Sequence, residues 1–294
     1  MPRIPDILLD TVIYLYPTAM DAESGARSGG TGFLVSVPAA TTGVPAALYA
    51  VTNSHIIREA KSPVVRLNTQ QGGKEVIPLT RDQWYHHPDG DDIAVCPIGL
   101  ETEHHRFFAL DRTGWFLTKE ELDADSIGPG DEVFFLGRFI NYEGQQRNLP
   151  TVRFGTISML PYEPIQHPRG TLVDSFLIEA RSLSGYSGSP VFLFVMPYTF
   201  RDMEWKDGIE GPNRARETRE ARISLLGIDW GHNEDFKPVL ESDKSTPLSD
   251  RWWVEQNSGI MNVAPVWKLT ELLDEPELVD MRRKLENDWA TERI

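Results

Sequence analysis

Hydrophobic residues fall mostly into short runs that are separated by glycine, proline and small polar residues. Runs of this length, rich in aliphatic and aromatic side chains, are typical of β-strands. The strands predicted in the first half are 7–16, 31–37, 47–57 (ending in a polar turn), 64–67, 75–79 and 91–98. Those predicted in the second half are 130–137, 151–160, 172–180, 225–231, 251–254 and 259–263.

Helical periodicity begins only near the C-terminal end. Pro265 can open a helix, and the apolar residues that follow recur at helical spacing, at Val266, Leu269, Leu272 and Leu273. This pattern predicts an amphipathic helix that continues through 278–285. A short helix is also expected near 119–122, inside a charged connector.

The segment 201–222 differs from the rest of the second half. It carries six basic and six acidic side chains and shows no apolar period. Such a composition is typical of a solvated insertion.

Two blocks of short strands with little helix before the end predict an all-β protein. We expect two antiparallel β-barrels followed by a C-terminal α-helix. The first barrel would span 1–115, the second 116–264, and the helix, packed on the barrels, 265–294.

Composition and charge narrow the range of partners. The net charge is −15 over 294 residues, which argues against nucleic acid or an anionic membrane as a partner. The single cysteine, Cys96, excludes an internal disulfide and fits a reducing compartment. Neither a signal peptide nor an apolar run of transmembrane length is evident, so a soluble cytoplasmic protein is expected.

Three polar residues stand at the ends of apolar runs: His55, Asp92 and Ser187. A hydroxyl is a weak nucleophile near neutral pH and needs an adjacent base. Imidazole suits that task, and a carboxylate on its far nitrogen fixes the tautomer. Ser187 also lies between Gly185 and Gly188, in a turn whose N–H groups can converge on one point.

The three residues belong to a wider set of motifs in collinear order. In chain order these are Thr-Gly-Phe-Leu-Val at 31–35, Val-Thr-Asn-Ser-His at 51–55, Asp-Ile-Ala-Val at 92–95, Gly-Asp-Glu-Val at 130–133 with Gly137, Phe-Gly-Thr-Ile-Ser at 154–158, Gly-Tyr-Ser-Gly-Ser-Pro at 185–190, Leu-Gly-Ile-Asp-Trp-Gly at 226–231 and Gly-Ile-Met-Asn-Val at 259–263. Over roughly residues 10–270 the chain resembles the chymotrypsin/trypsin-like serine proteases. It is most similar to the bacterial Deg/HtrA-type peptidase domain, without a PDZ domain.

The resemblance implies a trypsin-like serine endopeptidase that forms an acyl-enzyme on protein or peptide substrates and needs no cofactor or metal. Its catalytic residues would be Ser187 as nucleophile, His55 as general base and Asp92 as orienting acid. The N–H groups of Gly185 and Ser187 would form the oxyanion hole. The substrate-binding residues that it implies are Arg181 at the base of the specificity pocket, and Trp230, Gly231 and Gly259 along the cleft.

Some residues depart from the family pattern. Tyr186 replaces the aspartate that zymogens use, so activation by N-terminal cleavage is not expected. Ser189 replaces a glycine and adds a hydroxymethyl group beside the nucleophile, which we expect to be tolerated. Asp229 is expected to point away from Asp92, and Asp91 to be a solvated neighbour.

Alternative interpretations remain open from sequence. A catalytically silent chymotrypsin-fold binding module and a non-peptidase esterase share the same motifs. A regulatory protein partner, or ordering of 141–150 or 201–222, is expected to restrain a cytosolic protease. The pairs His86/His87 and His104/His105 have no cysteine or glutamate at ligand spacing and are interpreted as exposed loop histidines.

Overall fold

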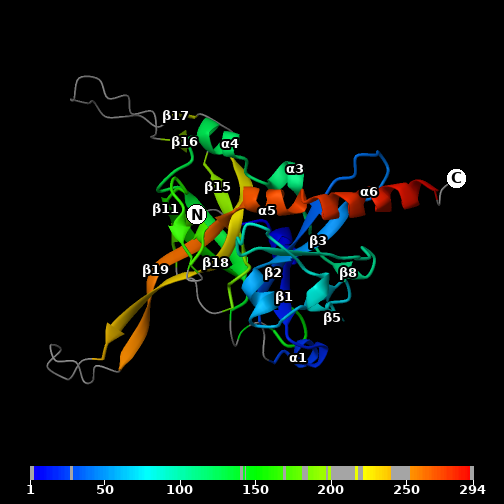
Figure 1. The fold of residues 1–294 in the computed structure, drawn as a ribbon, viewed down its shortest axis with the longest axis horizontal. Helices are drawn as coiled ribbons and strands as arrows, with labels where there is room; N and C mark the ends of the chain where they lie inside the picture. The colour runs from blue at the N-terminus through cyan, green and yellow to red at the C-terminus, as the bar shows by residue number, and fades with distance from the viewer. Residues whose placement is uncertain are drawn as a thin grey trace.

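The computed structural model describes residues 3–291, except 27–28, 140–141, 143, 168–169, 181–184, 197, 200–215, 218–220 and 240–251. The predicted all-β class is confirmed. The strands form two groups that follow one another along the chain, and two helices come last (Figure 1). The segment 201–222, interpreted above as an insertion, lies mostly outside the described residues.

The first half of the chain forms a nine-stranded sheet in the order β5-β4-β1-β2-β3-β7-β6, with β8 on β4 and β9 parallel to β2. Its strands are β1 (Val12–Tyr16), β2 (Gly30–Val37), β3 (Ala47–Thr52), β4 (Val64–Thr69), β5 (Lys74–Ile77), β6 (Tyr85–His86), β7 (Ala94–Pro97), β8 (His105–Arg106) and β9 (Leu110–Asp111). The helical turns between and after them are η1 (Asp6–Thr11), α1 (Ala19–Ser24), α2 (Ser54–Arg58), η2 (Arg81–Gln83), α3 (Arg112–Trp115) and α4 (Lys119–Ala124).

The second half forms a closed six-stranded barrel in the order β10-β11-β14-β19-β18-β15. Its strands are β10 (Glu132–Gly137), β11 (Thr151–Met159), β14 (Phe176–Glu179), β15 (Pro190–Val195), β18 (Arg222–Pro238) and β19 (Trp253–Pro265). Two short pairs accompany it, β12 (Ile165–Gln166) with β13 (Leu172–Val173), and β16 (Tyr198–Thr199) with β17 (Arg216–Glu217). Helices α5 (Val266–Leu273) and α6 (Pro276–Thr291) end the chain, as the periodicity predicted.

Several predicted strands have different bounds in the structure; the run 172–180, for example, is divided into β13 and β14. Residues 7–11 belong to a 3-10 helix rather than to the first strand, since Pro5 begins a turn in which the N–H of Leu8 donates to the Pro5 carbonyl at 3.1 Å. The runs at 251–254 and 259–263 are parts of the single strand β19, which pairs with β18 along an arm that projects from the barrel (Figure 1). Polar residues along this arm hid its strand character from the hydrophobic pattern.

Strand β1 is buried on both faces, which explains its uninterrupted apolar sequence. Ile13 and Leu15 belong to the core inside the N-terminal sheet, together with Cys96. Tyr14 and Tyr16 point to the opposite face and join the core that includes the C-terminal barrel. Successive side chains of a strand alternate between faces, so β1 contributes to both cores.

A fully buried arginine joins the two halves on this same face. The Nε of Arg66 donates to Asn148 Oδ1 at 2.8 Å, and its guanidinium also donates to the Gly144 carbonyl at 3.0 Å. Asn148 Nδ2 returns a bond to the Arg66 carbonyl at 2.7 Å. Burying a charge is costly unless its donors are satisfied, so these bonds fix the 144–148 loop against β4.

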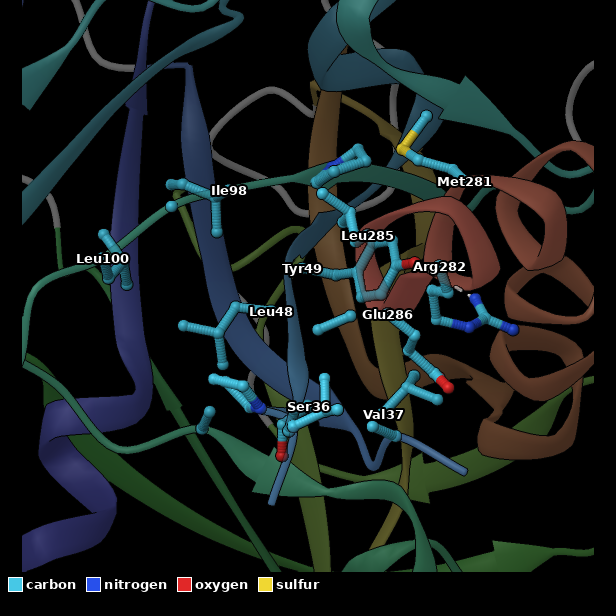
Figure 2. A pocket seen from close by; sticks show the side chains of 18 of the residues that line it. Ser36, Val37, Leu48, Tyr49, Ile98, Leu100, Met281, Arg282, Leu285 and Glu286 are labelled. Carbon is cyan, nitrogen blue, oxygen red and sulfur yellow. Dashed lines mark hydrogen bonds between the residues drawn. The ribbon is translucent and has the colours of Figure 1, made fainter. Parts of the chain in front are cut away.

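An apolar cavity of about 820 Å³ lies between α6 and the N-terminal sheet. Figure 2 shows Leu48 and Tyr49 from the sheet facing Met281, Arg282 and Leu285 from the helix. None of the three candidate catalytic residues lines it.

Among the described residues, no helix has the length and apolar character that crossing a membrane requires.

The packing of α5 gives a direct test of the fold. Leu269 is fully buried, whereas Leu285 on α6 is 56% exposed. Leu269→Ala should lower the free energy of unfolding by about 2–5 kcal/mol, the cost of an apolar cavity. Leu285→Ala, the matched control, should change it by less than about 1 kcal/mol. Urea denaturation measures both, and equal losses would contradict this packing.

Candidate active site

His55 and Asp92 form a tight pair at one end of the N-terminal sheet. The Nδ1 of His55 lies 2.6 Å from Asp92 Oδ2, and the backbone N–H of His55 donates to Asp92 Oδ1 at 2.9 Å. The Asp92 side chain is 2% exposed and that of His55 25% exposed. Both carboxylate oxygens are thus engaged by one residue, which holds the imidazole with Nδ1 towards the acid and Nε2 away from it.

The pairing of β3 with β7 brings these residues together from positions 37 apart in the chain. The two strands are antiparallel, with Thr52 opposite Ala94. His55 lies in the first turn of α2, which follows the end of β3, and Asp92 precedes β7. Asn53 Nδ2 donates to the Asp92 carbonyl at 2.8 Å, which ties the two strand ends together.

A second histidine borders this pair. Ser54 Oγ donates to the Ile93 carbonyl at 2.8 Å and lies 2.9 Å from His86 Nδ1. Because the hydroxyl has one proton, which it gives to the carbonyl, the His86 ring donates from Nδ1 to Ser54 Oγ. Burial, and then the nearby Arg58, lower the pKa of His86 to about 4, while Asp92 opposes them.

Ser187 lies in a turn between β14 and β15 that is bonded directly to the N-terminal sheet. The Ser187 carbonyl accepts from the N–H of Thr31 at 3.0 Å, and the Gly185 carbonyl accepts from Thr31 Oγ1 at 2.6 Å. Thr52 Oγ1 in turn donates to the Thr31 carbonyl at 2.7 Å. Since Thr52 ends the strand that leads to His55, the Ser187 turn is tied to the strand end that carries the imidazole.

Gly188 is required where the turn meets this sheet. Its φ is +85°, and a Cβ there would lie 2.0 Å from the Thr31 carbonyl oxygen and 2.5 Å from Thr52 Oγ1. Gly185 also has a positive φ, +100°. Neither the N–H of Gly185 nor that of Ser187 donates to a group among the described residues.

The two departures from the family pattern around Ser187 have structural explanations. Tyr186 is fully buried, and its hydroxyl contacts Thr151 Oγ1 and accepts from Arg153 Nε at 3.1 Å. It therefore anchors the turn inside the barrel. Ser189 is also fully buried, with its Oγ against Gly137, where a Cβ would lie only 2.2 Å from that oxygen. Its hydroxymethyl group packs into the barrel wall.

Asp229 fastens the same turn to β18. Its backbone carbonyl accepts from the Gly188 N–H at 2.8 Å, and its N–H donates to the Ser189 carbonyl at 3.0 Å. Its buried side chain accepts from the N–H of Gly231 at 3.0 Å. The carboxylate is therefore engaged by its own strand.

The predicted substrate-binding residues lie along the adjoining strands. Trp230 is buried, with its Nε1 3.2 Å from Ser175 Oγ. The Gly259 carbonyl accepts from the N–H of Ala180 at 2.8 Å, so β19 borders the segment that leads to Arg181. Arg181 itself lies outside the described residues.

His167 was not singled out by any motif, yet it lies beside the site. Its ring packs on Trp230 with centroids 4.6 Å apart, and both residues line a small cavity together with Asp92. Asp92 therefore lies where the N-terminal sheet meets the C-terminal barrel. A lone histidine before β13 gives no sequence signal for this contact.

The expectation that Asp91 is solvated was wrong. It is buried, 3.4 Å from His87 Nδ1 and 3.6 Å from Lys268 Nζ on α5. Burial raises the pKa of the Asp91 carboxyl, while Lys268 and His87 oppose the rise. The exposed position expected for His87 was wrong as well, because its side chain is 1% exposed. The C-terminal helix thus packs against the loop that presents Asp92.

No family model matches the chain, and no curated protein matches it. Solved structures of HtrA-type proteases resemble it in fold. AlgW with a decapeptide is 17% identical, with a TM-score of 0.44 and coverage of 83% of this chain and 50% of AlgW. Deg5 is 19% identical, with a TM-score of 0.42 and coverage of 63% and 75%.

A third solved structure is an inactive serine-to-alanine mutant of Rv3671c from M. tuberculosis H37Rv. It is 15% identical, with a TM-score of 0.45 and coverage of 90% of this chain and 85% of that one. This chain spans about half the length of the AlgW structure. At these levels the similarities concern the fold alone.

The lowered pKa of His86 should appear in the pH dependence of stability. Between about pH 6.5 and 4 the unfolded chain binds a proton that the folded chain does not, so the free energy of unfolding should fall as pH falls through this window. His86→Gln should lack this component. Urea denaturation at pH 7 and pH 4.5 tests it, and an identical pH dependence in both proteins would contradict the assignment.

The Thr31 hydroxyl should stabilise the contact between the two halves. Thr31→Val keeps the shape of the side chain but leaves the Gly185 carbonyl and the Arg138 N–H without this partner. The free energy of unfolding should fall by about 1–3 kcal/mol. Thr31→Ser keeps the hydroxyl and is the control. A loss in Thr31→Ser with none in Thr31→Val would show that the methyl group and not the hydroxyl matters.

Proposed function

We propose that this protein is a serine endopeptidase in which Ser187, His55 and Asp92 act as a catalytic triad. The observation that supports it best is the Asp92 carboxylate, which binds both Nδ1 and the backbone N–H of His55. This arrangement fixes the tautomer with a proton on Nδ1 and leaves Nε2 as the basic nitrogen. The Ser187 turn, bonded to the same strand end through Thr31, supplies the hydroxyl.

The proposed reaction follows from these roles. Ser187 Oγ attacks the carbonyl carbon of a peptide bond while His55 Nε2 takes the hydroxyl proton. The oxyanion that forms accepts from the N–H groups of Gly185 and Ser187. His55 then gives the proton to the leaving amine, which departs and leaves an acyl-enzyme. Water, deprotonated by His55, then attacks the acyl carbon. As the ester bond breaks, His55 returns the proton to Ser187 Oγ, which releases the carboxylic acid and regenerates Ser187. No cofactor or metal takes part.

Asp92 stabilises the imidazolium that forms in each step. Its buried position between sheet and barrel, beside Trp230 and His167, strengthens this interaction because water does not screen it. The edge formed by Trp230, Gly231 and Gly259 is proposed to bind the substrate backbone. Arg181 is proposed to favour an acidic side chain before the cleaved bond.

An active-site probe tests the proposal. A fluorophosphonate should label the wild type at Ser187 and fail to label Ser187→Ala. His55→Ala should be labelled far more slowly, since loss of a triad member costs roughly 10⁴- to 10⁶-fold in turnover. The matched control is Ser189→Ala, which removes a buried hydroxyl two residues away and should be labelled like the wild type.

The outcomes separate the alternatives. Labelling of Ser187→Ala, or no labelling of folded wild type, would overturn the triad and favour a silent binding module. Labelling with turnover of activated esters but of no peptide library would identify an esterase instead. Activity that appears only after a second protein is added would identify the expected regulatory partner.

A further inference from the structure

A cluster of metal-binding side chains lies apart from the catalytic candidates, at the side of β4. Glu75 on β5 stands opposite Leu67, and His105 on β8 stands opposite Thr69. Positions 67 and 69 share one face of the strand, so Glu75 and His105 project to the same side. His104 precedes His105 and joins them.

The three side chains converge on one point. Glu75 Oε2 contacts His104 Nε2 and lies 3.2 Å from His105 Nε2. One donor atom from each residue lies within 4.8 Å of the others. Two donors of a tetrahedral zinc ion, each about 2.1 Å from the metal, are about 3.4 Å apart. Glu75 and His104 are 38% and 47% exposed, so their side chains have the freedom to adjust to this spacing.

His105 supplies the observation that points to a ligand. Its side chain is 8% exposed, and its buried Nε2 makes no well-aligned hydrogen bond, although Glu75 Oε2 lies 3.2 Å from it. Leaving a buried polar atom without a partner is unfavourable. A metal ion between His105 and Glu75 would satisfy that nitrogen.

The backbone of Glu101 lies on the opposite side of the His105 ring. The His105 Nδ1 accepts from the N–H of Glu101 at 2.9 Å and also lies 3.2 Å from the Glu101 carbonyl oxygen. A metal-bound imidazole usually donates its other N–H to a carbonyl or carboxylate. In the metal-bound tautomer the Glu101 carbonyl would accept from that N–H, in place of the bond that Nδ1 accepts from the Glu101 N–H when no metal is bound.

The turn that carries the histidines is held in place by its backbone. The N–H of Gln70 donates to the His104 carbonyl at 2.9 Å, and Gln70 Nε2 donates to the carbonyls of Thr102 and His105 at 3.1 and 3.2 Å. The N–H of His105 donates to the Glu101 carbonyl at 2.7 Å. Little ordering of the main chain is therefore needed on binding.

We propose that Glu75, His104 and His105 bind one Zn²⁺ ion, with water in the fourth position. Two imidazoles and a carboxylate are a zinc donor set, whereas Mg²⁺ and Ca²⁺ prefer oxygen ligands. The ion would join β5 to the 101–105 turn and stabilise that side of the N-terminal sheet. The sequence interpretation favoured exposed loop histidines over a metal site because no cysteine or glutamate was recognised at ligand spacing around them. Strand pairing brings Glu75 there from 29 residues away, and the exposed position expected for His105 was wrong.

Zinc binding to the full chain tests the proposal. Protein stripped with a chelator is titrated with zinc chloride against a chromogenic chelator at pH 7.5. One saturable zinc per chain is expected, together with a rise of several degrees in Tm, since a ligand that binds only the folded state stabilises it. Magnesium should have neither effect. Cobalt should give visible absorption bands typical of four-coordinate nitrogen and oxygen ligands.

Substitutions locate the ion. His104→Ala and Glu75→Gln alter exposed side chains, so folding should persist. Zinc affinity should fall by more than about tenfold, because substituting even a residue that only supports a metal ligand can lower the affinity by that much. Glu103→Gln, an exposed acid in the same turn, is the control and should bind like the wild type. No saturable zinc, or unchanged affinity in both ligand variants, would overturn the site. The readouts do not depend on catalysis by Ser187.

Discussion

The placement of the Ser187 turn against the N-terminal sheet depends on Thr31. Its N–H and its hydroxyl donate to the carbonyls of Ser187 and Gly185, and its own carbonyl accepts from Thr52. One residue thus bonds the turn of the C-terminal barrel to the end of β3. Gly188 allows this approach, because a side chain there would collide with the Thr31 carbonyl. This contact is made by backbone groups and short threonine hydroxyls rather than by long, flexible side chains.

Three consecutive side chains form a connected network of hydrogen bonds around Asp92. Asn53, Ser54 and His55 are consecutive, and each bonds to Asp92 or Ile93. Buried networks of this kind favour one conformation strongly, since any rearrangement leaves a polar group without a partner. The C-terminal helix adds a second constraint through Lys268 and Asp91, so the end of the chain helps to fix the loop that presents the carboxylate.

The sequence was sufficient for features that depend on local order. The fold class, the C-terminal helix and the positions of His55, Asp92 and Ser187 at strand ends follow from short motifs and periodicity. Contacts between residues that lie far apart in the chain were not predicted. The burial of Asp91 requires α5, and the place of Glu75 beside His105 requires the two strands that flank β4. Neither leaves a pattern in the linear chain.

The most direct test of the account is whether Ser187 and His55 act as one unit. Hydrolysis of an activated ester would be compared for the wild type, Ser187→Ala, His55→Ala and the double variant. The effects of substituting residues of a triad on the rate are strongly non-additive. The double variant should therefore be no slower than the slower single variant. Losses that multiply in the double variant, or a single variant that keeps the wild-type rate, would contradict the account.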